Sequence, residues 1–108
     1  MVNIKAIDVK HLKSKLDNNE EFTLIDVRES QELEICKINQ AIHIPMSNIP
    51  NCLDEINFEQ PVVIICKSGG RSAQVCHFLN EQGYLDVYNL SGGIIAWALE
   101  IDSTITTY

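Results

Sequence analysis

The residues with the clearest chemical potential follow an apolar run near the middle of the chain. Val62–Ile65 is rich in β-branched residues and leads directly into Cys66, and the pair Gly69 and Gly70, then Arg71, follow it. Such a run predicts a buried strand of a parallel sheet. A helical pattern begins near Arg71, so Cys66 is expected on a tight loop between a strand and a helix. In open α/β sheets that edge is where ligands bind.

The composition of this loop predicts that it binds an anion. Gly69 and Gly70 can adopt backbone angles that other residues avoid, so successive N–H groups can turn toward one point. The following helix adds unpaired N–H groups and the positive end of its dipole, which favour the thiolate of Cys66. A helix terminus contributes only about 1 kcal/mol. Positive charge from Lys67 and Arg71 is therefore needed to make the thiolate dominant, and it would also attract an anionic substrate.

A plainer interpretation makes Cys66 a small, buried hydrophobic residue at the end of a strand. We favour the chemical interpretation because the glycine pair, the arginine and the helix start occur together. The other cysteines, Cys36, Cys52 and Cys76, form no C-x-x-C pair with it and lack the spacing of metal ligands. Because the sequence shows no export signal, we expect all four cysteines to be thiols. A resolving disulfide partner for Cys66 stays open as an alternative, and we expect no metal and no other cofactor.

Several segments resemble a known family. The active-site loop of the rhodanese-like domains, the sulfurtransferases of the thiosulfate type, is similar to residues 66–72 of this chain, Cys66-Lys67-Ser68-Gly69-Gly70-Arg71-Ser72. The family's aspartate-valine-arginine segment is similar to Leu24–Glu29, and its glycine-glycine–tryptophan segment is similar to Leu90–Trp97. Together with Ala41–Pro45 the match spans nearly the whole chain. The resemblance implies that Cys66 is the catalytic nucleophile and that residues 67–72 bind the substrate.

The order of predicted elements indicates an α/β fold with a parallel sheet, since strands and helices alternate. Strands are expected at residues 2–6, 22–27, 41–44, 62–65 and 87–90. Helices are expected at residues 8–16, 30–35, 49–56 and 71–82, and a last helix opens at Gly92-Gly93 and carries Trp97. The resemblance implies the rhodanese-like three-layer arrangement, a central five-stranded parallel sheet with helices on both faces. We expect one domain over residues 1–108, with a core at about 3–100 and a C-terminal tail at 101–108.

A polar cluster follows the second predicted strand, at Asp26, Arg28, Glu29 and Glu32. Neighbouring carboxylates can perform acid–base chemistry. A cluster at a strand end more often pairs internally and caps the next helix, so we expect mainly structural roles for these side chains. His43 lies in an apolar predicted strand, and we interpret it as a core or edge residue without a chemical role.

The overall charge narrows the class of partner. The chain has 108 residues and a formal net charge of −7, which argues against a general nucleic-acid or acidic-membrane binder. Any positive potential at the Cys66 loop must therefore be local. The sequence has no N-terminal signal segment and no apolar run long enough to span a bilayer, so the expected location is cytoplasmic.

The resemblance implies an enzyme that moves a sulfane sulfur from thiosulfate or a similar anionic donor to cyanide, a thiol or a protein acceptor, through a persulfide on Cys66. One alternative is a cysteine phosphatase or arsenate reductase, which also combines a cysteine, a ring of amides and an arginine. Those enzymes typically have a longer loop between cysteine and arginine, and the shorter loop here suits a single sulfur atom. A second alternative is a non-catalytic sulfur-carrier or interaction module, although such modules commonly lose the cysteine.

Overall fold

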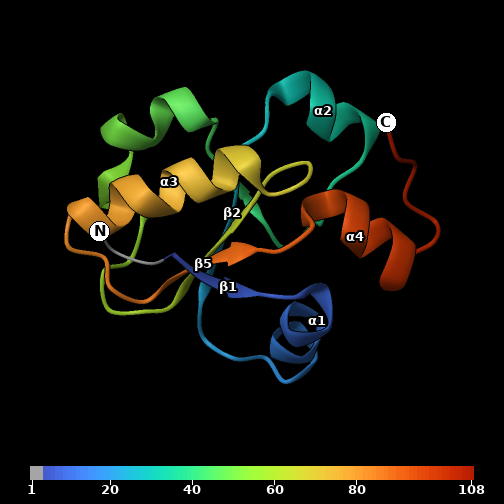
Figure 1. Cartoon of the computed structure of the whole chain (residues 1–108), viewed down its shortest axis with the longest axis horizontal. Helices are drawn as coiled ribbons and strands as arrows, with labels where there is room; N and C mark the ends of the chain where they lie inside the picture. Colours follow the sequence, from blue (N-terminus) through green and yellow to red (C-terminus); the bar gives the residue numbers. More distant parts are fainter. Residues whose placement is uncertain (1–3) are drawn as a thin grey trace.

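The computed structural model describes residues 4–108 and contains a single sheet of five parallel strands in the order β1-β5-β4-β2-β3 (Figure 1). The strands are β1 (Lys5–Ile7), β2 (Thr23–Asp26), β3 (Ile42–His43), β4 (Val62–Ile65) and β5 (Val87–Leu90). The α-helices are α1 (Val9–Asp17), α2 (Ser30–Ile35), α3 (Gly70–Glu81) and α4 (Gly93–Glu100). The predicted α/β fold is confirmed. Residues 2 and 3 of the first predicted strand lie outside the described part of the chain.

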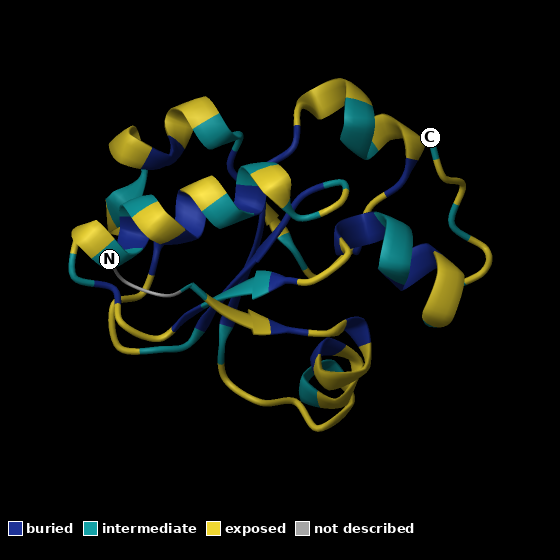
Figure 2. Cartoon of the chain, in the orientation of Figure 1, coloured by how far each residue is buried: buried dark blue, intermediate teal, exposed yellow. Residues whose placement is uncertain are grey.

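Strand β4 lies at the centre of the sheet, between β5 and β2, and all four of its residues are buried. Its side chains alternate between two apolar clusters. Ile64 packs in the cluster that contains Val75 of α3, while Val63 packs in the cluster that contains Leu12 of α1 and Ile94 of α4. Helices therefore cover both faces of the sheet, and the buried residues gather along its central strands (Figure 2). This is why β4 is a continuous apolar run.

The predicted helix at residues 49–56 is wrong. Two short 3₁₀ helices stand there instead, η1 (Met46–Asn51) and η2 (Leu53–Glu55). The first begins directly after Pro45, so Pro50 falls in its interior rather than in the first turn, where a missing N–H group does no harm. The segment closes with shorter hydrogen-bonded turns, such as that from Cys52 N to the Ile49 carbonyl at 3.0 Å.

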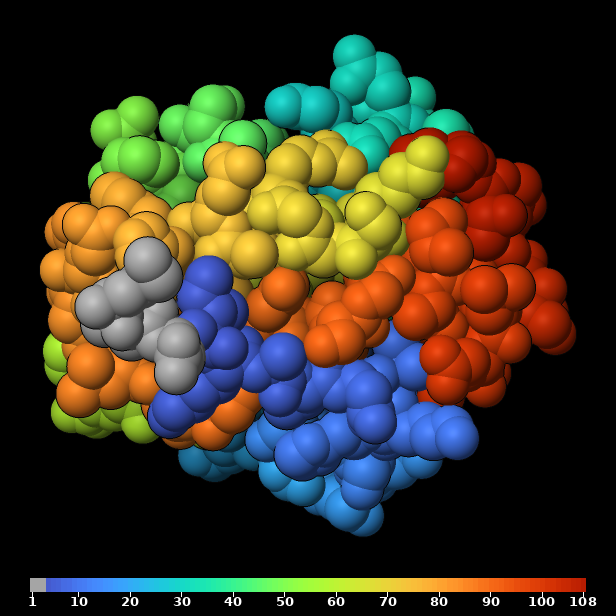
Figure 3. All heavy atoms as spheres, in the orientation of Figure 1, coloured from blue at the N-terminus to red at the C-terminus, as the bar shows by residue number. Residues whose placement is uncertain are grey.

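The C-terminal residues pack on the body of the domain. Ile101, Ile105 and Tyr108 lie against the cluster between the sheet and helices α1 and α4. In the space-filling view the end of the chain lies against the surface beside α2 and the loop after β4 (Figure 3). Within residues 4–108, no helix combines the length and the apolar character needed to cross a bilayer.

Candidate active site

The direction of the chain reverses between β2 and β4. After β2 the chain continues outward to β3, whereas after β4 it crosses α3 to reach β5 on the other side. A crevice at the carboxyl ends of strands forms at such a switch point, and ligands of open α/β sheets bind there. Cys66 follows β4 and Arg28 follows β2, so the topology brings the predicted nucleophile and the predicted polar cluster to the same place.

The loop after β4 curls around the sulfur of Cys66. The N–H group of Gly69 donates to Sγ at 3.0 Å, and the hydroxyl oxygen of Ser72 lies 3.2 Å from Sγ. Gly69 has a φ of 116°, a left-handed angle that favours glycine and that turns its N–H group inward. Cys66 is only 1% exposed and lies at the floor of the loop. Ser68 and Gly70, at the mouth of the loop, are exposed.

The N-terminus of α4 holds the outer side of this loop. The main-chain N–H groups of Ile94 and Ile95 donate to the carbonyls of Cys66 and Lys67, at 2.9 and 3.2 Å. Gly93 permits this approach, since a Cβ atom there would lie 2.4 Å from the Lys67 carbonyl oxygen. These carbonyls are thereby engaged outside the loop, which leaves N–H groups to face the sulfur. The glycine pair before Trp97 was the sequence signal for this contact, but sequence reasoning used it only to start a helix.

The surroundings of the sulfur favour the thiolate. Burial raises the pKa of Cys66, but the hydrogen bonds that the Ser72 hydroxyl and the main-chain N–H groups of Ser72, Gly69 and Ser68 can offer to the thiolate outweigh it, so the pKa lies below its ordinary value. The pKa of Cys76, in α3, is shifted in the opposite direction, because burial raises it to about 12. All four cysteines are free thiols, as expected.

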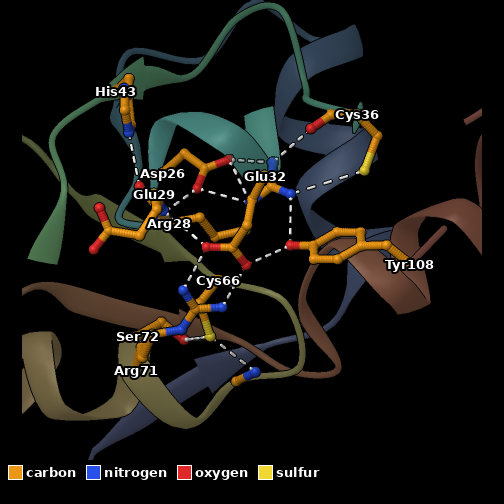
Figure 4. A network of polar contacts seen from close by, with 11 residues as sticks. Asp26, Arg28, Glu29, Glu32, Cys36, His43, Cys66, Arg71, Ser72 and Tyr108 are labelled. Atoms are coloured by element: carbon orange, nitrogen blue, oxygen red, sulfur yellow. Dashed lines mark hydrogen bonds and ion pairs between the residues drawn. The ribbon is translucent and has the colours of Figure 1, made fainter. Parts of the chain in front are cut away.

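Arg71 does not point its guanidinium at Cys66. It forms a two-pronged ion pair with Glu32 of α2, with Nη1–Oε2 and Nη2–Oε1 distances of 2.7 and 2.8 Å (Figure 4). Glu32 also accepts from the main-chain N–H of Glu29 at 2.8 Å and so completes the N-terminal cap of α2. The hydrogen bonds from Arg71, with smaller contributions from Tyr108 and Glu29, lower the pKa of Glu32 to about 2. A carboxylate of the polar cluster thus reaches the loop and fixes its arginine.

Arg28 is a structural residue at the same edge of the sheet and is fully buried. Its guanidinium donates to both oxygens of Asp26 and, through Nη2, to the carbonyl of Cys36 at 2.8 Å. His43 Nε2 lies 2.7 Å from the Arg28 carbonyl oxygen, which can only accept, so this nitrogen carries the proton. These contacts link the ends of β2 and β3 and do not reach the sulfur, in agreement with the structural roles expected for Asp26, Arg28 and His43.

Two residues of the site were missed by sequence reasoning. The hydroxyl of Tyr108 accepts from Arg28 Nη1 at 2.9 Å and donates to Glu32 Oε1 at 2.7 Å, and its ring centroid lies 4.5 Å from Lys67 Nζ. Asn89 of β5 donates to the carbonyl of Gly69 at 3.1 Å and accepts from the hydroxyl of Ser72. The first lies in a tail without periodicity and the second inside a strand, so neither had a local signal.

The arrangement provides a nucleophilic sulfur surrounded by hydrogen-bond donors, with cations at the mouth of the loop. That combination can carry negative charge on a sulfur atom and can attract a small anion. No group of three or more His, Cys, Asp or Glu side chains within residues 4–108 is arranged to hold a metal ion.

Comparison with known proteins identifies the family. The sequence profile of the rhodanese-like domain matches residues 8–100. A sulfurtransferase of Allochromatium vinosum is 43% identical over 95 residues, which cover 88% of this chain and 89% of that protein. The thiosulfate sulfurtransferase GlpE of Actinobacillus pleuropneumoniae is 34% identical over 87 residues, 81% of each chain.

The structural comparison agrees. The crystal structure of a rhodanese-like domain protein from Staphylococcus aureus has a TM-score of 0.84 and 33% identity, and the match covers 97% of this chain and 99% of that one. Named sulfurtransferases among the relatives support a role in sulfur transfer. The chain belongs to the rhodanese-like domain family.

Proposed function

We propose that this protein is a thiosulfate sulfurtransferase that works through a persulfide on Cys66. The observation that carries the proposal is the direction of the main chain around the sulfur. Gly69 N–H points at Sγ at 3.0 Å, while the carbonyls of Cys66 and Lys67 are bound by the N-terminus of α4. The interior of the loop is therefore lined by donors and suits a negatively charged sulfur.

The proposed reaction has two steps. In the first, the Cys66 thiolate attacks the outer sulfur of thiosulfate, and the sulfur–sulfur bond of the donor breaks. Its electron pair leaves with sulfite, and Cys66 keeps a terminal sulfur with a single negative charge. In the second step cyanide, a thiol or a protein acceptor attacks that terminal sulfur, and Cys66 leaves as a thiolate. The charges balance in both steps, and no separate base is required once the thiolate has formed.

Residues 67–72, which were predicted to bind the substrate, have different roles in the proposed reaction. The Gly69 N–H group holds the reacting sulfur, since it already donates to Sγ at 3.0 Å, and the N–H groups of Ser68 and Ser72 help to lower the pKa of Cys66. Lys67 has no carboxylate at salt-bridge distance among the described residues, so we assign to it the oxygens of the donor's anionic end. Gly70 leaves the mouth of the loop open. Arg71 acts as a fixed positive charge, because both of its terminal nitrogens are engaged by Glu32.

The position of Arg71 also bears on the phosphatase alternative. A phosphate or arsenate would need the guanidinium turned toward the ligand above the cysteine, as a two-pronged partner. Here the pair with Glu32 occupies that edge of the guanidinium. The loop with its four residues between Cys66 and Arg71 suits sulfur transfer better.

The test is the intact mass of the pure, reduced protein after incubation with thiosulfate. We expect the mass to increase by one sulfur atom, and cyanide should reverse the gain with release of thiocyanate. Cys66→Ser should abolish the gain. Cys52→Ser is the matched control, since this partly buried thiol lies away from the loop, and it should behave as the wild type. An unchanged wild-type mass together with hydrolysis of a phosphate ester would refute the proposal.

A further inference from the structure

Asn89 contacts two residues that are hydrogen-bonded to the sulfur of Cys66, Gly69 and Ser72. Its side-chain nitrogen donates to the carbonyl of Gly69 at 3.1 Å, and its side-chain oxygen accepts from the hydroxyl of Ser72. Gly69 and Ser72 are in turn within 3.0 and 3.2 Å of Sγ. The side-chain amide of Asn89 is thus linked to the sulfur of Cys66 through two residues, Gly69 and Ser72, although it makes no hydrogen bond to the sulfur itself.

The orientation of this amide is fixed by its neighbours. A main-chain carbonyl can only accept, so the Gly69 oxygen must face the NH₂ group of Asn89. The amide oxygen of Asn89 then faces Ser72 and also can only accept. Ser72 has one hydroxyl proton, and the contact with Asn89 uses it. A lone pair of the Ser72 oxygen is therefore turned toward Sγ, and the 3.2 Å contact is satisfied when the thiol of Cys66 donates.

Ionisation of Cys66 changes this arrangement. A thiolate has no proton to donate, so a Ser72 hydroxyl that still faces Asn89 would present a lone pair to a negative sulfur. The hydroxyl must rotate and donate to the sulfur, which leaves the amide oxygen of Asn89 without its donor. Asn89 and the sulfur of Cys66 therefore compete for one proton. The main-chain N–H group of Gly69 takes no part in this competition, because it donates directly to the sulfur.

We infer that Asn89 is a positioning residue that holds the Ser72 proton, favours the thiol form of Cys66 at rest, and releases the proton to the sulfur when negative charge develops there. The inference deepens the proposed sulfur transfer and rests on it for its biological purpose. A resting thiol resists oxidation better than a thiolate. In the persulfide, the negative charge on the terminal sulfur would favour rotation of the Ser72 hydroxyl toward the sulfur.

The other groups that act on the sulfur stay constant when Asn89 is changed. Arg71 and Cys76, both on α3, interact electrostatically with Cys66. Helix α4 presents main-chain N–H groups to the loop, and the nearest carboxylate of β2, Asp26, is paired with Arg28. A neutral replacement of Asn89 therefore changes only its two contacts, with the Ser72 hydroxyl and with the Gly69 carbonyl. The experiment must separate the effect of the first contact from that of the second.

The experiment measures the rate at which iodoacetamide alkylates Cys66 as a function of pH, with the Cys66 peptide followed by mass spectrometry. The midpoint of this pH profile reports the pKa of the Cys66 thiol. Asn89→Leu, of similar shape, frees the Ser72 proton for the thiolate. A hydrogen bond is worth enough to increase the thiolate fraction below the midpoint about threefold to tenfold, so the midpoint should move to lower pH. In a Ser72→Ala background the same Asn89→Leu change should have no effect on the midpoint. A midpoint that stays or rises, or an equal shift in both backgrounds, would overturn the inference.

Ser72→Ala alone provides a second test that does not need the Asn89 variant to fold. If Ser72 accepts from the thiol, and donates to the thiolate only by giving up its bond to Asn89, its removal should raise the midpoint only slightly, in the direction in which this hydroxyl acts on the pKa of Cys66. A rise of about one pH unit would mean that the hydroxyl already donates fully to the thiolate, against the inference. Alkylation requires no sulfur donor, so these results are separate from the persulfide test. A failed persulfide test with the predicted midpoint shifts would refute sulfur transfer and leave the role of Asn89 intact.

Discussion

Tyr108→Phe isolates the contribution of one hydroxyl to the contacts that link Arg28 and Glu32 beside the Cys66 loop. The hydroxyl accepts from Arg28 at 2.9 Å and donates to Glu32 at 2.7 Å, so both of its partners are charged. A buried hydrogen bond to a charged group contributes about 1.5–3 kcal/mol. Tyr108 is only half-buried, so water replaces part of what is lost, and we expect the variant to lose about 2 kcal/mol of unfolding free energy in total.

Urea unfolding followed by circular dichroism measures this loss, and the slope of free energy against urea should not change. Tyr84→Phe is a matched comparison, because that hydroxyl lies 3.1 Å from the carbonyls of Leu53 and Ile56, which are both neutral. It should cost about 1 kcal/mol. A Tyr108→Phe variant within about 0.5 kcal/mol of the wild type, the range of ordinary surface substitutions, would refute the reasoning. So would a loss smaller than that of Tyr84→Phe.

Further predictions concern other residues around the Cys66 loop. Gly93→Ala should destabilise the fold and greatly slow persulfide formation, since its Cβ would lie 2.4 Å from the Lys67 carbonyl oxygen; thermal melting and intact mass measure the two effects. Glu32 has a folded pKa of about 2, below its ordinary value of 4.5, so its contribution to stability is present at neutral pH and is lost as the pH falls from about 4.5 toward 2. Glu32→Gln should therefore be less stable than the wild type at pH 7, with the gap closing near pH 2 in acid unfolding; a gap that stays constant with pH would contradict this. Lys67→Gln should raise the KM for thiosulfate severalfold with little change in kcat, and an unchanged KM would remove Lys67 from donor binding.

The fold was predictable where its signals are local. Val62–Ile65 is continuous and apolar because β4 is buried on both faces of the sheet. The buried residues of α3 lie three and four positions apart, as expected for one face of a helix; they are Ser72, Val75, Cys76 and Leu79. The error at η1 and η2 had a different origin. Local patterning could not tell where the helical segment begins, and a start at Met46 instead of Ile49 moved Pro50 to a position that an α-helix does not tolerate.

The sequence predicted the loop that carries Cys66, but it did not predict the distant residues that hold the loop and its arginine in place. Cys66 and its glycines are adjacent in sequence, so their chemistry could be read from spacing. The pair of Arg71 with Glu32 joins residues 39 positions apart, and the bond of Tyr108 to Arg28 joins residues 80 apart. Such contacts depend on how the elements pack, and no local pattern encodes them. We interpreted the polar cluster as structural, but only the structure shows that Glu32 links it to the Cys66 loop through Arg71.

The pairing of the charges around the loop bears on how the proposed reaction would release its first product. Both neighbouring arginines are paired with carboxylates, Arg28 with Asp26 and Arg71 with Glu32. What remains for a ligand is Lys67 and the main-chain N–H groups, and those dipoles act at hydrogen-bond distance. For the proposed reaction this matters, since the leaving sulfite is itself doubly charged and a free guanidinium would retain it. Donors directed at Sγ stabilise the persulfide after sulfite has left, so the site can keep the transferred atom and release the anion.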